Sequence, residues 1–556
     1  MELDRAGYAS IYGPTAGDRV RLGDTNLLLE VESDDTAAGS EPLVGFGKTI
    51  RDGLLGTSRL PAEEALDAVV TNVVLLDPVL GIRKTSIGIR DGRIAAVGRA
   101  GNPETMDGVS VPISAATGII PAEGLIATPG VIDSHIHLIS PQLVPTALSG
   151  GVTTLVAMGY GAAWDVGVGP RGNFDRLLDA WRAVPLNLLP LARASAFDEA
   201  FLEGSLAWGA GGFKVHEDTG AYPAIVDAAV SVADRHDVQV ALHLDGLGES
   251  ATLEESLAAI GGRTVHLYHL EGCGGGPANL LEAAALDNVL PSSTNPTVPY
   301  GATAVDEHEE MIRTVHRLHP RFGNDLTAAR ERVRGWTMAA ESVLQDLGAI
   351  SIMSSDSLGM GRVGETFRRT WQLAHVMKAA LGGGGRNDNE RILRYVAKLT
   401  INPAIAHGIA HDVGSLEPGK LADIVLWRPA FFGAKPQVVI KAGFGVWGPL
   451  GSGSASTRLG EPLVYSGQWG AAGGGPAALA TVYASAAGFE RVAARWPGLV
   501  QQVRGCRSLR KSDMVRNAAT PEVKVDPAAK RVYIDGAPVE LEPVEELPLN
   551  RAYFLT

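Results

Sequence analysis

The stretch Gly130-Val131-Ile132-Asp133-Ser134-His135-Ile136-His137 decides the fold, because apolar residues lead directly into a His-x-His pair. In an extended strand, side chains two residues apart lie on the same face, so His135 and His137 project together from one strand end. Imidazole nitrogens bind zinc, nickel, copper and iron. Two partly exposed histidines on an ordinary strand would give the same pattern, so the later histidines have to decide between these interpretations.

Seven further apolar segments follow along the chain, and helical patterns separate most of them. Eight strands that alternate with helices predict an α/β fold, a (β/α)8 barrel of the TIM type, although a doubly wound open sheet shows the same alternation. The predicted strands are 131–137, 152–158, 186–191, 212–217, 238–244, 264–270, 289–293 and 350–355. The predicted helices between them include 173–184, 221–235, 253–260 and 278–286, each apolar on one face.

Short β-like runs precede the barrel, and an Arg90-Asp91-Gly92 turn between two of them predicts a hairpin. β-like sequence returns after the barrel and is expected to complete the same small sheet. We therefore predict three parts: an N-terminal β-rich domain over 1–128, a catalytic barrel over 129–410, and a return to the β domain with a C-terminal segment over 411–556. The seventh barrel connection, 295–347, is much longer than the others, and insertions at this place commonly form lids.

Composition limits the kinds of partner. The chain has 556 residues, a net charge of −14 and two cysteines, Cys273 and Cys506. The negative charge argues against general binding to nucleic acid or to anionic membranes. Two cysteines provide no disulfide framework. No run of about 18 apolar residues, the length of a membrane-spanning helix, is found, and residues 1–20 lack the apolar core of a signal peptide. We expect a protein of the reducing cytoplasm that crosses no membrane.

Metal-ligating side chains recur where predicted strands end, which is where barrels of this type place their catalytic groups. Five of the 13 histidines lie at such ends, and the eighth strand ends at a carboxylate. Buried histidines bound to carbonyls would explain any one of these positions but not the whole set. The residues are His135, His137, His216, His243, His269 and Asp356.

Lys214 is the unusual member of this group, because a cationic ammonium is repelled by metal ions. A neutral lysine could react with CO2 and form an anionic carbamate with two oxygens, which would bridge two metals. A surface lysine, or one paired with Asp218, is the simpler interpretation from the chemistry alone.

The ligand order of these residues resembles the amidohydrolase superfamily and, more narrowly, the urease alpha-subunit family. The resemblance runs nearly from end to end. It rests on the segments 12–22 (YGPTAGDRVRL), 133–137 (DSHIH), 214–218 (KVHED), 261–266 (GGRTVH), 290–297 (LPSSTNPT), 354–357 (SSDS), 360–365 (MGRVGE), 400–404 (TINPA) and 429–433 (PAFFG).

The resemblance implies two nickel ions per chain, bridged by an N6-carboxylysine at Lys214. His243 and His269 would hold one ion, and His135, His137 and Asp356 the other. It also implies that the cytoplasmic enzyme hydrolyses urea, pairs with urease beta and gamma subunits in a trimer of such units, and needs accessory proteins that load nickel. The implied catalytic residues are His216 as a hydrogen-bond donor to the urea oxygen, His316 as general acid, and Asp218 and Arg332, which would orient His316. The implied substrate contacts are His216, His243 and Gly359.

Several positions near the expected pocket depart from the family. Val315 stands where ureases usually have a cysteine, Gly359 where alanine is common and Pro277 where histidine is common, and the 159–172 loop is shortened and altered. A divergent urease, or a urease-derived amidohydrolase acting on another small ureido or amide compound, would both fit. A di-zinc cyclic amidohydrolase of the dihydroorotase or hydantoinase type and a non-catalytic scaffold subunit remain as alternatives.

Overall fold

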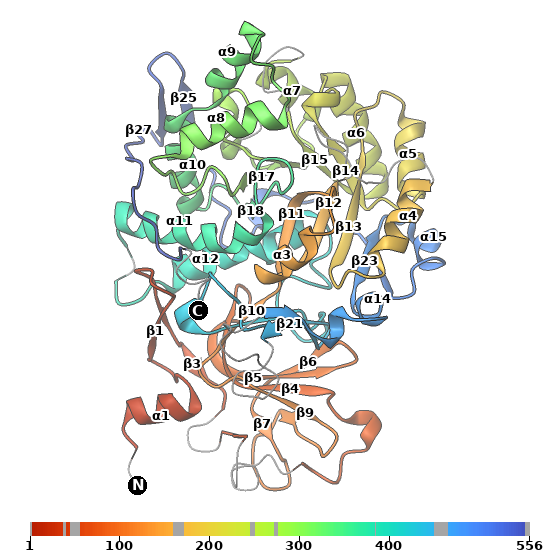
Figure 1. The fold of residues 1–556 in the computed structure, drawn as a ribbon, viewed down its shortest axis with the longest axis vertical. Helices are drawn as coiled ribbons and strands as arrows, with labels where there is room; N and C mark the ends of the chain where they lie inside the picture. The colour runs from red at the N-terminus through yellow and green to blue at the C-terminus, as the bar shows by residue number, and fades with distance from the viewer. Residues whose placement is uncertain are drawn as a thin grey trace.

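The eight predicted barrel strands form one parallel sheet in chain order in the computed structural model (Figure 1). The structure describes residues 3–36, 41–44, 56–158, 172–244, 251–271, 276–383, 385–449 and 465–550. The altered loop at 159–172 lies, except for its last residue, outside these ranges. The strands are β11 (Val131–His137), β12 (Val152–Met158), β13 (Asn187–Arg193), β14 (Gly212–Val215), β15 (Gln239–Leu242), β16 (Val265–Leu267), β17 (Val289–Thr294) and β18 (Ile352–Ser354). The fold is therefore the predicted TIM-type barrel, nearly closed.

The first and last strands meet at their C-terminal ends. The Asp356 backbone N–H donates to the His135 carbonyl at 2.8 Å, and the His137 N–H donates to the Ser357 carbonyl at 3.0 Å. Two predicted metal ligands of β11 are thus tied by the backbone to the segment that carries the third, although more than 200 residues separate them in the sequence.

Helices cover the outside of the barrel, and their apolar faces explain why the strands between them are continuously apolar and buried. Local signals begin and end them: α7 starts at a capping box formed by Thr252 and Glu255 and stops at Gly261, whose φ is 62°. The predicted helix at 278–286 is a 3₁₀ helix, η3 (Ala278–Ala285). The helices are α3 (Leu143–Ser149), α4 (Gly172–Trp181), α5 (Glu199–Ala207), α6 (Pro223–His236), α7 (Leu253–Ile260), α10 (Gly335–Leu347), α11 (Thr366–Leu381), α12 (Asn389–Leu399) and α13 (Ile401–Ala406).

Below the barrel in Figure 1 lies a second sheet, built from chain segments on both sides of the barrel. β10 and β19 pair antiparallel across this junction, with Ile126 opposite Trp427, so the returning chain completes the sheet as predicted. The predicted hairpin is present: Asp91 and Gly92 both have positive φ, 52° and 74°, as a tight two-residue turn requires. The strands are β3 (Ser33–Asp34), β4 (Ala68–Asp77), β5 (Gly81–Arg90), β6 (Arg93–Gly98), β9 (Gly118–Pro121), β10 (Ile126–Pro129), β19 (Ile424–Trp427), β20 (Val438–Lys441), β21 (Phe444–Pro449) and β22 (Tyr465–Gly467).

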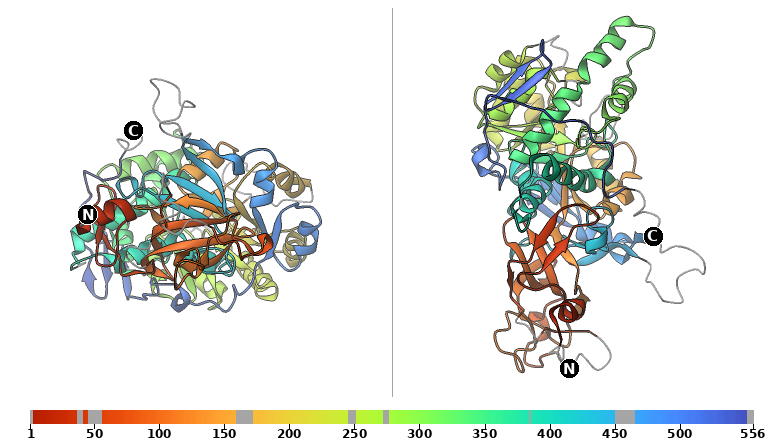
Figure 2. Two further views of the ribbon diagram at one scale, coloured as in Figure 1. Left: turned by 90° about the horizontal axis from the view of Figure 1, so that it is seen from below. Right: turned by 90° about the vertical axis from the view of Figure 1, so that its left-hand side faces the viewer.

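The seventh connection is helical. α8 (Ala304–Val315) and α9 (Gly323–Arg332) stand out from the barrel at the end of the molecule opposite the N-terminal sheet, as Figure 2 shows. Within the described ranges, none of the helices has the length and apolar character needed to span a bilayer. The remaining described α-helices and strands are α1 (Arg5–Tyr12), β1 (Arg19–Arg21), β2 (Leu28–Glu30), β7 (Ala100–Gly101), β8 (Val111–Pro112), α14 (Gly475–Leu479), β23 (Thr481–Ala484), α15 (Phe489–Ala493), β24 (Leu499–Gln502), β25 (Val523–Asp526), β26 (Arg531–Ile534) and β27 (Ala537–Pro538). Short 3₁₀ helices lie at η1 (Ala62–Glu64), η2 (Glu217–Thr219), η4 (Val363–Glu365), η5 (Pro429–Phe431), η6 (Trp469–Ala471) and η7 (Lys511–Asp513).

Candidate metal centre and active site

The predicted ligands gather at the C-terminal ends of the barrel strands, and all are buried, with at most 6% of any residue exposed. The ring centroids of His135 and His269 are 5.3 Å apart, those of His243 and His269 4.3 Å, and those of His216 and His243 4.1 Å. Asp356 completes the group from the end of β18. The structure therefore brings the strand-end histidines and the carboxylate into one cluster.

His135, His137 and Asp356 form the tightest part of this cluster. Asp356 Oδ1 lies 3.1 Å from Nε2 of each histidine, so the ligand atoms already face one point. Burial on its own would raise the pKa of the Asp356 carboxyl, but the two imidazoles hold that pKa well below its usual value. Asp356 also has a left-handed backbone, with φ at 58°, a conformation that aspartate adopts more readily than most non-glycine residues.

Lys214 lies beneath these ligands without an ion-pair partner in the described part of the chain. Its residue is 1% exposed, and its Nζ has no hydrogen-bond partner and lies 3.9 Å from the ring centroid of Tyr268. Burial lowers the pKa of the Lys214 amine well below its ordinary value, which favours the neutral amine. A neutral, orphaned amine can react with CO2.

The surrounding donors fit a metal pair as well. Nδ1 of His269 is buried without a hydrogen-bond partner, and an imidazole nitrogen left in this way is a ready ligand. Burial lowers the pKa of His243 and of His269 well below the usual value, so both rings are neutral and can offer a lone pair. The residues present therefore fit two divalent ions joined by an anionic bridge at Lys214.

Asp218 connects the two predicted catalytic histidines. Its backbone N–H donates to His216 Nδ1 at 3.1 Å, and its carboxylate Oδ1 lies 3.2 Å from His316 Nδ1. Since Nδ1 of His216 accepts a hydrogen bond, and since burial lowers the pKa of His216 well below its usual value, the ring is neutral and carries its proton on Nε2. His216 is thus preset as a hydrogen-bond donor.

Arg332, expected to orient His316, donates its Nη2 to both carboxylate oxygens of Glu217, at 3.0 and 3.1 Å. Glu217 Oε1 also lies 3.1 Å from Nε2 of His243. Glu217 was not among the predicted site residues. Its place in the segment 214–218, between His216 and Asp218, was the available signal.

A cavity of about 400 Å³ opens above the ligands. The departures Val315 and Gly359 both border it, and a Cβ added at Gly359 would meet Asp356 Oδ1 at 2.4 Å. Its lining is His135, His137, Ile139, His216, His243, Thr314, Val315, His316, Arg317, Asp356, Leu358, Gly359 and Met360. The lid helix α8 therefore contributes to the cavity through its C-terminal end.

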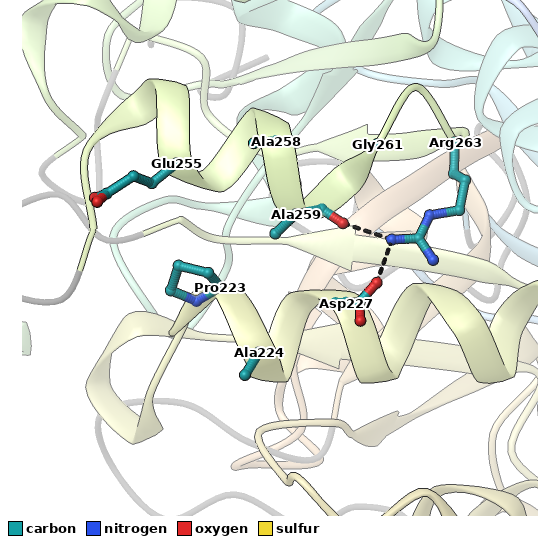
Figure 3. A pocket seen from close by; sticks show the side chains of 8 residues that line it. All are labelled: Pro223, Ala224, Asp227, Glu255, Ala258, Ala259, Gly261 and Arg263. Atoms are coloured by element: carbon teal, nitrogen blue, oxygen red, sulfur yellow. Dashed lines mark hydrogen bonds and ion pairs between the residues drawn. The ribbon is translucent and has the colours of Figure 1, made fainter.

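A second hollow, of about 710 Å³, lies between α6 and α7 on the outside of the barrel (Figure 3). Its cationic residue Arg263 is already engaged, since it donates to the Asp227 carboxylate at 2.7 Å and to the Ser231 hydroxyl at 2.9 Å. It contains none of the predicted site residues, so we place the candidate site at the strand ends.

Comparison with known proteins shows the family to which the chain belongs. The model of the amidohydrolase family matches residues 126–446, and the model of the urease alpha-subunit N-terminal domain matches residues 1–120. Urease subunit alpha 2 of Streptomyces coelicolor is 50% identical over 559 residues, which is 100% of both chains, and urease subunit alpha 1 of Streptomyces avermitilis is 50% identical over 552 residues, 99% of each.

Among solved structures, a D-hydantoinase (dihydropyrimidinase) from Thermus sp. has a TM-score of 0.47 and 17% identity, over 68% of this chain and 95% of that chain. The identity to the full-length Streptomyces chains is far higher and extends over the lid and the second sheet as well as the barrel. The chain belongs to the urease alpha-subunit family of the amidohydrolases.

Proposed function

We propose that this chain is the catalytic subunit of a urease and hydrolyses urea to ammonia and carbamate, with two nickel ions bridged by carbamylated Lys214. The observation that supports this most directly is the buried Lys214 amine, which has no partner although it lies among five histidines and a carboxylate. Burying such a group is costly unless another species satisfies it. A bridging carbamate and two metals would do so.

His243 and His269 would hold one ion, and His135, His137 and Asp356 the other. Two ions held in this way would supply Lewis-acid chemistry: they would polarise a carbonyl oxygen and lower the pKa of water to about 7. Every proposed ligand is buried. This burial keeps the imidazoles neutral and keeps bulk water out of the cluster.

His216 would donate its Nε2–H to the urea oxygen, because its Nδ1 is already taken by the Asp218 N–H. His316 would protonate the leaving nitrogen. Its Nδ1–H is held by the Asp218 carboxylate, so the proton that it transfers is the one on Nε2. Because His316 closes the C-terminal end of α8, the acid is carried by the lid and not by the barrel.

A second candidate is hydrolysis of another small ureido or amide compound. It is favoured by Val315 and Gly359, which border the cavity at positions where the family commonly has other residues. The cavity volume of about 400 Å³ is within the range of pockets that hold small organic ligands.

We also propose that the chain assembles with urease beta and gamma subunits in a trimer of such units, that accessory proteins load the nickel, and that the enzyme works in the cytoplasm. The division of the chain at 128 and 410 stays a prediction.

The test is ammonia release from urea. The chain is co-expressed with its neighbouring subunits and maturation factors in nickel-supplied cells, and the metal content is measured in the same sample. We expect activity with about two nickel ions per chain, abolished in Lys214→Ala and nearly so in His316→Ala. Two bound metals without ammonia release would refute urea as the substrate and would favour the second candidate.

A further inference from the structure

Glu217 lies between the cluster of proposed metal ligands and the lid, which is the seventh connection with α8 and α9. Its Oε1 is 3.1 Å from Nε2 of His243, and its two oxygens receive Nη2 of Arg332 at 3.0 and 3.1 Å. The side chains of all three residues are at most 8% exposed. The His243–Glu217 contact is short enough for an ion pair. Its angles do not meet those of a hydrogen bond, since His243 Nε2 has no hydrogen-bond partner among the described residues.

A carboxylate at this place determines which nitrogen of His243 is available to a metal. In neutral imidazole one nitrogen carries the proton and the other offers a lone pair. An anionic oxygen beside Nε2 favours the proton on Nε2, and so leaves the lone pair on Nδ1. The His243 ring also lines the cavity.

Arg332 comes from a different part of the fold than Glu217 and His243. It ends α9, in the long seventh connection, whereas Glu217 and His243 follow β14 and β15. A buried carboxylate is costly without a cationic or hydrogen-bonding partner, and the guanidinium of Arg332 supplies one from the lid. The three side chains therefore join the root of the lid to the cluster.

We infer that Glu217 is a positioning residue: it holds His243 with its proton on Nε2 and its Nδ1 free for a metal, and Arg332 of the lid holds Glu217 in that place. The inference rests on the proposed metal centre, and it adds a residue to which the family comparison and the sequence motifs assigned no role.

The test compares metal binding by the apoprotein, prepared with its partner subunits in cells grown without nickel. Nickel is titrated in the presence of bicarbonate and a competing chelator, which gives a dissociation constant and a stoichiometry without any use of urea. We expect Glu217→Ala to weaken nickel binding by about 10- to 100-fold at unchanged stoichiometry. Glu217→Gln should weaken it less, because its amide oxygen still accepts from His243 Nε2–H.

Asp346→Asn is the matched control. Asp346 receives Nε and Nη2 of Arg391 at 2.8 and 2.9 Å in a similarly buried pair that borders no part of the cavity. Loss of this pair should lower the melting temperature and leave the nickel constant unchanged. If Glu217 and Arg332 act together, the losses of nickel affinity caused by Glu217→Gln and Arg332→Gln should not add. The double variant should then bind nickel about as tightly as whichever single variant binds it less tightly.

Three results would overturn the inference. The first is an unchanged nickel dissociation constant in a folded Glu217→Ala variant. The second is the loss of one whole metal equivalent with the other unaffected, which would make Glu217 a ligand, and the third is an equal loss of nickel affinity in Asp346→Asn. The proposed function fails separately. A wild-type protein that binds nickel but releases no ammonia would refute the urease proposal and leave the comparison of variants valid, whereas a wild-type protein that takes up no metal would refute both.

Discussion

Gly359 allows a direct test of how tightly this chain packs around its proposed metal ligands. A Cβ placed at this residue would lie 2.4 Å from Asp356 Oδ1 and 3.1 Å from His137 Nε2. Real Cβ atoms stay beyond 3.0 Å from such neighbours, so Gly359→Ala must separate the two atoms by at least about 0.6 Å. Metal ligands tolerate departures of only about 0.2 Å, so the carboxylate could not move that far and remain a good ligand.

The expected cost follows from the overpacking involved. Adding a methyl group where there is no space costs about 1–3 kcal/mol, which corresponds to about 5- to 150-fold in an equilibrium constant. Since the clash falls on Asp356 and His137, we expect this loss in the nickel dissociation constant and in the fraction of active enzyme, more than in the melting temperature. The assay is nickel titration against a competing chelator, followed by ammonia release at full occupancy.

Gly474→Ala is the control, because a Cβ at Gly474 meets nothing within 4 Å and its backbone already has φ at −86°. Wild-type nickel binding in Gly359→Ala would refute the reasoning. It would mean that the 356–361 loop moves aside at little cost.

Three further predictions concern other buried groups. Asp218→Asn removes the carboxylate that holds His316 Nδ1 at 3.2 Å, so ammonia release at saturating urea should fall by about 10²- to 10⁴-fold with the nickel content unchanged; a variant that retains full activity would disprove the pairing. Burial lowers the pKa of Lys511 from 10.5 to about 7, so the unfolded chain binds a proton that the folded chain lacks between these values, and stability rises with pH across that window. Lys511→Met should therefore raise the melting temperature at pH 6, with the gain shrinking toward pH 10.5, and a gain independent of pH would contradict this assignment. Burial raises the pKa of Glu341 from 4.5 to about 7, so wild-type stability falls as pH rises from 4.5 through 7; Glu341→Gln, which resembles the protonated acid, should raise the melting temperature at pH 8 and leave it unchanged at pH 4.5, as thermal unfolding at the two pH values would reveal.

Much of the barrel could be predicted because its signals are local. Each strand is a short apolar run that ends in polar residues, and the rule that barrels place chemistry at C-terminal strand ends assembled His135, His216, His243 and Asp356 without any knowledge of distance. Lys214 shows the limit of this reasoning. Its chemistry alone favoured a surface lysine or a salt bridge, whereas the family resemblance implied a carbamate. Its burial without a hydrogen-bond partner is the structural argument for the carbamate.

The features that were missed depend on contacts between distant segments. Glu217 and Arg332 are 115 residues apart, and an acidic residue in a strand-end loop looks like any solvated carboxylate until its partner is known. In the same way β23, from the C-terminal segment, pairs with β13 through Val482 and Leu188, and nothing in its short apolar run points to the barrel. Such pairings follow from the packing of the whole chain.

The backbone hydrogen bonds between the end of β11 and the residues after β18 have a consequence for biosynthesis. His135 leaves the ribosome 221 residues before Asp356, so no nascent chain that lacks β18 can present the complete ligand set. The sheet closes and the ligand set becomes complete in one event, because the same bonds do both. A partly made or truncated chain thus cannot offer the three proposed ligands His135, His137 and Asp356 to a metal together. If these residues bind metal as proposed, metal capture would report completed barrels in a translation time course.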